Sequence, residues 1–175
     1  MELKKWAYYE KRVKELFYTD DDHEKKSDTK TTKLIVIVGN HDIGFHYDMK
    51  EKKIQRFNNS FNGQQFVHLY QPKERNDLNF VIVNSMAMEN DGCQFCNKAQ
   101  RQLQLVNRTL NREKKLNDRV YSRPILFTHF PLYRQSDSIC PKDIDSESIV
   151  HDKDHFDIFK PKYDCLSKEA TRQVN

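Results

Sequence analysis

Three residues with metal-binding and proton-transfer chemistry, Asn40, His41 and Asp42, follow directly on an apolar run at 34–38. This run is rich in β-branched residues, which is typical of a buried strand, and Gly39 would let the chain turn sharply after it. Ligand sites of open α/β sheets lie at the carboxyl ends of strands. An amide oxygen, an imidazole and a carboxylate at that position suit a divalent cation beside a proton donor. The grouping therefore predicts metal-assisted hydrolysis.

A second candidate ligand, His129, follows another apolar segment, 125–127, and Thr128 and Pro131 flank it. We expect Asn40 and His129 to converge where two neighbouring strands end. Each residue also has a purely structural alternative. Asn commonly forms an Asx-turn after a strand, and a single His at a strand end is often a satisfied structural residue.

The two motifs together resemble a known family. The segment 39–42 (Gly-Asn-His-Asp) resembles the third signature block of the calcineurin-like metallophosphoesterases, and 127–133 resembles the fourth. Longer segments are similar to a narrower branch of that family, whose members remodel glycosylphosphatidylinositol anchors. These segments lie at 39–47, 56–58, 83–86, 131–134 and 163–170, so the resemblance covers nearly the whole chain.

The resemblance implies a role for each motif residue. Asn40 and His129 would be ligands of one of two divalent cations, commonly manganese, that hold the phosphate of a diester. His41 would protonate the leaving oxygen, a task that suits an imidazole. Asp42 would orient His41, although a capping or loop carboxylate is an equal alternative. Four further residues could touch the phosphate or headgroup, or simply pack their loops: His46, Tyr47, Tyr133 and Arg134.

Three signature blocks of the family have no counterpart in these residues. The resemblance therefore implies one partial domain over 1–175, a two-sheet α/β sandwich flanked by helices and incomplete at both ends. We expect the chain as given to be catalytically inactive, because the bridging carboxylate and several metal ligands would lie outside it. Two alternatives to an anchor-remodelling phosphodiesterase remain: an inactive piece with a binding or regulatory role, or an enzyme of the same clan acting on another phosphoester.

Hydrophobic periodicity predicts alternating helices and strands. The apolar stripe of a first helix, 2–17, would include Trp6, Tyr9, Leu16 and Phe17. The polar residues 19–32 would form a linker, and 134–162 a long loop. The other expected elements are strand 33–38, helix 50–62, strands 66–70 and 78–84, helix 97–116, strand 123–128 and helix 167–174.

Charge and hydropathy limit the partners. The net charge of +4 comes from 30 basic and 26 acidic residues that are spread along the chain, so no nucleic-acid partner is expected. No apolar run approaches the ~20 residues that span a bilayer. The resemblance implies membranes between the endoplasmic reticulum and the Golgi apparatus, with attachment only through segments that this chain does not contain. The expected partner is a phosphodiester substrate, such as the glycolipid of an anchored protein.

The cysteines Cys93 and Cys96 form a CxxC motif just before a predicted helix. A structural zinc site would need two further ligands at similar spacing, and no such pair exists. We favour a structural disulfide or plain thiols over a redox or metal-binding role.

Overall fold

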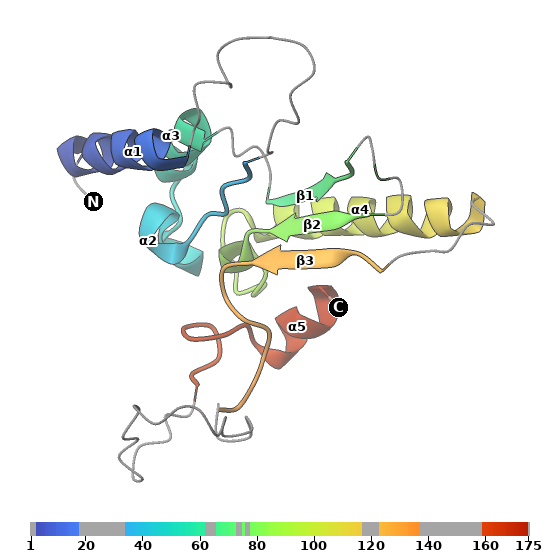
Figure 1. The fold of residues 1–175 in the computed structure, drawn as a ribbon. Helices are drawn as coiled ribbons and strands as arrows, with labels where there is room; N and C mark the ends of the chain where they lie inside the picture. The colour runs from blue at the N-terminus through green and yellow to red at the C-terminus, as the bar shows by residue number, and fades with distance from the viewer. Residues whose placement is uncertain are drawn as a thin grey trace, which may run out of the picture.

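A computed structural model describes residues 3–17, 34–61, 66–72, 75, 78–116, 123–136 and 159–174. The expected linker and most of the expected long loop fall outside these residues. Helices and strands alternate along much of the chain (Figure 1). The elements are α1 (Leu3–Phe17), α2 (Asn40–Ile43), η2 (His46–Asp48), α3 (Glu51–Phe61), β1 (Val67–Tyr70), β2 (Phe80–Val83), η3 (Ser85–Ala87), α4 (Cys96–Leu116), β3 (Ile125–Thr128) and α5 (Lys168–Val174).

The strands form one mixed sheet in the order β1-β2-β3. β1 and β2 are antiparallel, with Val67 opposite Val83, whereas β2 and β3 are parallel, with Val83 opposite Thr128. Parallel neighbours end at the same edge of a sheet, so the segments that follow β2 and β3 start side by side. The α/β class is confirmed. The second sheet of the expected sandwich is not among the described residues and stays a prediction.

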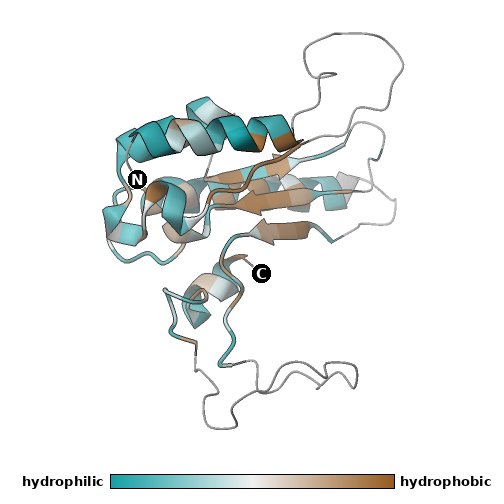
Figure 2. Cartoon of the chain, turned by 60° about the vertical axis from the view of Figure 1, so that its left-hand side comes forward, coloured by the Kyte–Doolittle hydropathy of each residue, from teal (hydrophilic) through white to brown (hydrophobic). Residues whose placement is uncertain are grey.

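One face of the sheet makes the core. Alternate strand residues such as Val67, Val81 and Val83 are buried, as the two-residue period of a strand requires. The helix α4 lies behind the sheet (Figure 1), and its residues Ala99 and Leu110 join the same core. The strands are strongly hydrophobic, and much of the helical surface is hydrophilic (Figure 2). Leu103 and Val106 pack against this core as well, so the apolar stripe that the sequence predicts for helix 97–116 (Ala99, Leu103, Val106 and Leu110) is confirmed.

The other face of the sheet is open in the described structure. A strand forms as predicted within 123–128, but it is less buried than its apolar residues suggest, because Ile125 is 45% exposed, Phe127 is 41% exposed, and Leu126 and Thr128 are only half-buried. The rings of Tyr70 and Phe80 lie 6.0 Å apart, and those of Phe80 and Phe127 lie 5.9 Å apart. These side chains form an aromatic strip, Tyr70–Phe80–Phe127, across all three strands.

The apolar run at 34–38 is not a strand, although the sequence predicted one. Leu34 and Ile35 are each 37% exposed, whereas Val36 and Val38 pack against the core. The described residues supply no ladder partner for this run, and a strand is defined by its partner's hydrogen bonds. A run of β-branched residues indicates that the backbone prefers an extended conformation, but it does not indicate whether another strand lies beside it to form the hydrogen bonds of a sheet.

Helix α1 forms as predicted, but its apolar stripe is mostly exposed. The predicted stripe also included Leu3 and Val13; Tyr9, Leu16 and Phe17 are 54%, 60% and 61% exposed, whereas Val13 is half-buried and Trp6 is buried. The Trp6 ring lies edge-on to Phe57 at 6.4 Å and to Phe61 at 6.1 Å, both on α3. The sequence pattern identifies the apolar face of a helix. How much of that face is buried depends on how far the neighbouring element, here α3, extends along it.

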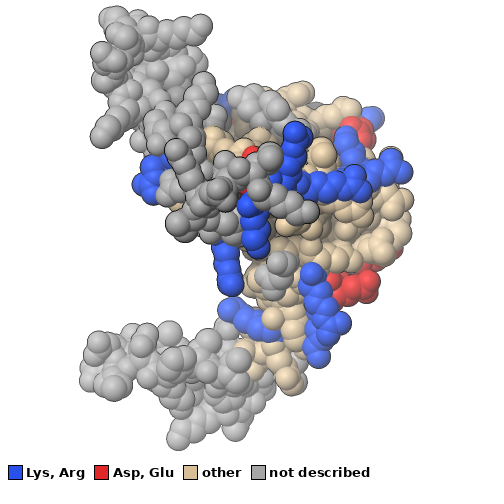
Figure 3. Space-filling view, turned by 90° about the vertical axis from the view of Figure 1, so that its right-hand side faces the viewer, with Lys and Arg blue, Asp and Glu red and all other residues tan. Residues whose placement is uncertain are grey.

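On the face that Figure 3 shows, Lys and Arg side chains predominate over Asp and Glu and extend over much of the described part of the chain. None of the described helices is long and apolar enough to cross a membrane.

The segment before α5 should be essential to the fold. Leu166 is fully buried, and its backbone nitrogen donates to the carbonyl of Pro131 at 3.0 Å. Leu166→Ala should lower the free energy of unfolding by about 2–5 kcal/mol, because it removes apolar contacts and leaves a cavity. The matched variant Leu105→Ala, at a site 63% exposed on α4, should change it by no more than about 0.5 kcal/mol. Urea unfolding followed by circular dichroism measures both, and equal effects would contradict the packing described.

Candidate functional site

The two candidate ligands meet in space. Asn40 is the first residue of α2, and His129 directly follows β3. Their side chains, 89 residues apart in the sequence, are in contact, with Asn40 Oδ1 3.0 Å from His129 Nε2. The structure therefore places both side chains at one site, where the end of β3 meets the turn after the extended run.

These two atoms have the chemistry and the spacing of adjacent metal ligands. Amide oxygens and imidazole nitrogens both bind divalent cations. In octahedral coordination, two neighbouring ligands that each lie ~2.1 Å from the cation and subtend an angle of about 90° at it are about 3.0 Å apart. Asn40 Oδ1 and His129 Nε2 have this separation. The residues fit a cation at this point. Two neutral ligands are fewer than the three or four of a complete site, so these two residues alone would not hold a cation firmly.

Gly39 lies directly against the His129 ring. A Cβ atom at position 39 would lie 3.0 Å from His129 Cε1 and 3.1 Å from Nε2. The backbone of Gly39, with φ −112°, is ordinary for any residue. The sequence predicted that the chain turns at Gly39, where a side chain would clash, and the structure places a turn there. The backbone conformation does not require glycine, but a side chain at this position would press on the His129 imidazole, which would have to shift by a few tenths of an ångström.

Asp42 caps the turn that carries the motif. Its Oδ2 accepts a hydrogen bond from the backbone nitrogen of Gly39 at 2.8 Å, and its own nitrogen donates to the Gly39 carbonyl at 3.1 Å. Such reciprocal bonds fix the first turn of a helix. In the described structure the carboxylate makes no hydrogen bond to His41, which supports the capping alternative for Asp42.

His41 lies on the exposed side of the same turn. Within the described residues, its imidazole has no hydrogen-bonding partner, so both ring nitrogens are open to solvent or to a ligand. This placement suits an exchange of protons with a bound molecule. The role itself stays a prediction.

His46 is buried, with only 3% of its surface exposed, and protein groups surround both of its ring nitrogens. Nδ1 lies 3.2 Å from the Met86 carbonyl and 3.3 Å from Asp91 Oδ2, and Nε2 lies 2.8 Å from the Lys162 carbonyl. A ring engaged on both sides has no free nitrogen for a substrate. The structure therefore supports the loop-packing alternative for His46.

The three other proposed substrate residues have different surroundings. Tyr47 lies in η2, and its side chain is outside the described structure. The Tyr133 backbone nitrogen donates to Thr171 Oγ1 at 2.8 Å, which holds this segment against α5. The exposed Arg134 lies with its guanidinium 4.8 Å from the centre of the Phe159 ring. Their packing contacts are described, and their contacts with substrate stay predictions.

The CxxC motif forms a disulfide between Cys93 and Cys96 at the start of α4, which agrees with the structural alternative. Both cysteines are buried, and Cys96 Sγ lies 3.7 Å from Asp91 Oδ1. The Asp91 carboxylate thus lies between the disulfide and His46. The sequence did not indicate this cluster, because no spacing rule connects Asp91 with His46.

Comparison with known proteins identifies the class. The chain is 40% identical to the metallophosphoesterase 1 homolog of Drosophila melanogaster over 146 residues, which covers 79% of the chain and 36% of the fly protein. It is 41% identical to metallophosphoesterase 1 of Gallus gallus over 155 residues, covering 82% of the chain and 37% of that protein. The Xenopus laevis protein is 43% identical over 158 residues, with 82% and 38% covered. No family model and no solved structure matches the chain.

These relatives are metallophosphoesterases, a class that uses divalent metal ions to hydrolyse phosphoesters. Within that class, the chain belongs to the metallophosphoesterase 1 family. It spans little more than a third of the length of the curated relatives that it matches.

The contact beneath His129 gives a direct test of the site. Gly39→Ala should push the His129 ring away from Asn40, because the new methyl group would lie about 3.0 Å from the imidazole. The side-chain ¹⁵N signals of His129 in an NMR spectrum should shift. Gly92→Ala is the control, since a Cβ there would meet nothing within 4 Å, although its φ of +79° makes it strained. Unchanged His129 signals in Gly39→Ala would contradict the close approach.

The buried ring of His46 should stabilise the fold. His46→Phe keeps an aromatic ring but leaves the carbonyls of Met86 and Lys162 without this partner, which should destabilise the protein by about 1–3 kcal/mol. His68→Phe is the matched control, because His68 is exposed on β1. Chemical unfolding of both variants measures the difference, and equal stability would show that the His46 hydrogen bonds contribute nothing.

Proposed function

We propose that this chain contributes to a metal-dependent phosphodiesterase that removes ethanolamine phosphate from a mannose of the glycosylphosphatidylinositol anchor. The observation that supports this best is the contact between Asn40 and His129, with His41 on the same turn. Membership of the metallophosphoesterase 1 family agrees with phosphoester chemistry. The anchor substrate and a location on membranes between the endoplasmic reticulum and the Golgi apparatus are parts of this proposal that come from the sequence resemblance.

Each residue has a separate task in this proposal. Asn40 and His129 would hold one of two divalent cations, with manganese the expected metal. A bound divalent cation supplies positive charge that stabilises the phosphoryl oxygens as the bond breaks. His41 would donate a proton to the departing sugar oxygen. Asp42 would hold the turn, and therefore His41, in place through its bond to Gly39.

A second candidate function follows from the number of ligands. The described residues bring only Asn40 and His129 together as neutral ligands, which is too few to bind a hard cation firmly. The chain alone would then be inactive and would act through binding. The test is to compare phosphodiesterase activity with manganese for the chain alone and for the protein from the complete reading frame. Activity in the second and little or none in the first would show that catalysis needs residues outside the described site.

The roles can be separated by measuring turnover and metal content in the protein from the complete reading frame. His41→Ala should lower turnover of a diester with a poor leaving group by about 10²–10⁴-fold and leave the bound manganese unchanged. Asn40→Ala and His129→Ala should lower the bound manganese first, because each removes a ligand.

Bis-p-nitrophenyl phosphate provides the internal control, because its leaving group needs little protonation and should conceal much of the His41 effect. Metal content is measured by inductively coupled plasma mass spectrometry. If His41→Ala loses the metal while Asn40→Ala keeps it, the assigned roles are reversed.

A further inference from the structure

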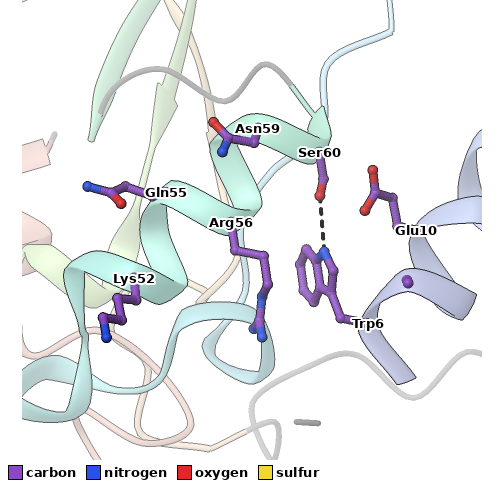
Figure 4. Close-up of a pocket in the computed structure, with 8 residues that line it drawn as sticks. Trp6, Glu10, Lys52, Gln55, Arg56, Asn59 and Ser60 are labelled. Atoms are coloured by element: carbon purple, nitrogen blue, oxygen red, sulfur yellow. Dashed lines mark hydrogen bonds between the residues drawn. The ribbon is translucent and has the colours of Figure 1, made fainter. Parts of the chain in front are cut away.

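A polar groove lies between α1 and α3, apart from the contact of Asn40 with His129. Its volume is about 540 Å³, and it is a shallow depression open to solvent rather than an enclosed cavity. Figure 4 shows Trp6 and Glu10 extending from α1 toward Arg56 and Ser60 of α3, whereas the Asn59 side chain points away from α1. The residues that line the groove are not among those assigned to catalysis or metal binding above.

Arg56 is held rigidly at the wall of this groove. Its guanidinium lies 4.2 Å from the centre of the Trp6 ring, a stabilising cation–π distance. One terminal nitrogen, Nη2, donates to the Asp42 carbonyl at 3.2 Å. The Nε atom is buried and has no hydrogen-bond partner in the described structure. Because Nε is enclosed by protein atoms, a ligand in the groove can reach only the terminal nitrogens of the guanidinium, of which Nη2 makes one hydrogen bond and has a second N–H.

Lys52 adds a second positive charge. It lies one helical turn before Arg56 on α3, and both residues line the groove. The neighbouring Lys50 and Lys53 pair with Asp48 at 3.7 Å and 2.9 Å, but no described carboxylate pairs with Lys52. Its ammonium group is therefore available to a ligand.

The acidic residue of the groove is already balanced. Lys14 donates to Glu10 Oε1 at 2.7 Å, and this hydrogen bond holds the pKa of Glu10 below its ordinary value. The Ser60 hydroxyl accepts from Trp6 Nε1 at 3.0 Å. Lys14 thus balances the charge of Glu10. The positive charges and hydrogen-bond donors of Lys52 and Arg56 are then in excess in the groove.

We propose that this groove binds the phosphate group of a small phosphate ester, through Arg56 and Lys52. A guanidinium and an ammonium group are the side-chain groups that recognise phosphate oxygens. Because Arg56 also bonds to the Asp42 carbonyl, the bound phosphate would act on the turn that carries His41.

The single tryptophan of the chain reports on this groove directly. Trp6 fluorescence should change in a saturable way on titration with inorganic phosphate or with glycerol 3-phosphate, at constant ionic strength and in EDTA. EDTA removes any metal-bound phosphate from the measurement. His129→Ala should bind both anions as the unaltered chain does, which separates this groove from the proposed catalytic site. If glycerol 3-phosphate binds more tightly than inorganic phosphate, the groove also recognises the ester part of the ligand. If the two bind equally, it recognises the phosphate group alone. Both results support a phosphate site.

Two neighbouring lysines provide matched variants. Lys52→Gln should weaken phosphate binding about tenfold, the typical loss of one charge-assisted hydrogen bond. Lys53→Gln should leave the affinity unchanged, because Lys53 is occupied with Asp48. Arg56→Lys keeps the charge but loses the planar fork and should weaken binding at least as much as Lys52→Gln. Thermal unfolding checks that each variant is folded. The proposal is overturned by a titration without saturation, or by equal affinities of Lys52→Gln and Lys53→Gln.

Discussion

The buried imidazole of His46 is the interaction on which the arrangement of the site depends. A polar ring removed from water must find partners inside the protein, and His46 finds them in segments 40 and 116 residues away. The left-handed residues of the described chain other than glycine are His46, Asn90 and Lys162, which all lie in or beside this cluster. Their strained conformations persist because the surrounding bonds fix them. The ring thereby fastens the turn after α2, the loop before α4 and the turn before α5 to one another.

The order and type of the larger elements could be predicted from the sequence, because periodicity records which residues prefer a helix or a strand. The helices α3 and α4 and the strands β1 and β2 lie where their apolar patterns place them. The run at 34–38 shows the limit of that argument, since its partner is not written in its own residues. The short turns α2, η2 and η3 were missed, because capping bonds such as that of Asp42 to Gly39 determine them.

The candidate site shows the same division. Two motifs with familiar spacing indicated Asn40 and His129, and the structure brings these side chains together. The sequence could not show that Gly39 makes room for an imidazole, because that contact joins residues 90 positions apart. It also could not distinguish a substrate-binding His46 from a buried one, since both interpretations need the same residue. Arg56 was visible only as part of a family string, and its stacking on Trp6 depends on how α1 crosses α3.

The aromatic strip formed by Tyr70, Phe80 and Phe127 has a consequence for handling the protein. The rings form a continuous apolar surface across the three strands, and β3 has no ladder partner on its outer side in the described structure. A flat apolar face beside an open strand edge favours self-association as the protein concentration rises. This face would oppose the solubility that the net charge of +4 supplies, so we expect self-association to fall on dilution or in a mild detergent.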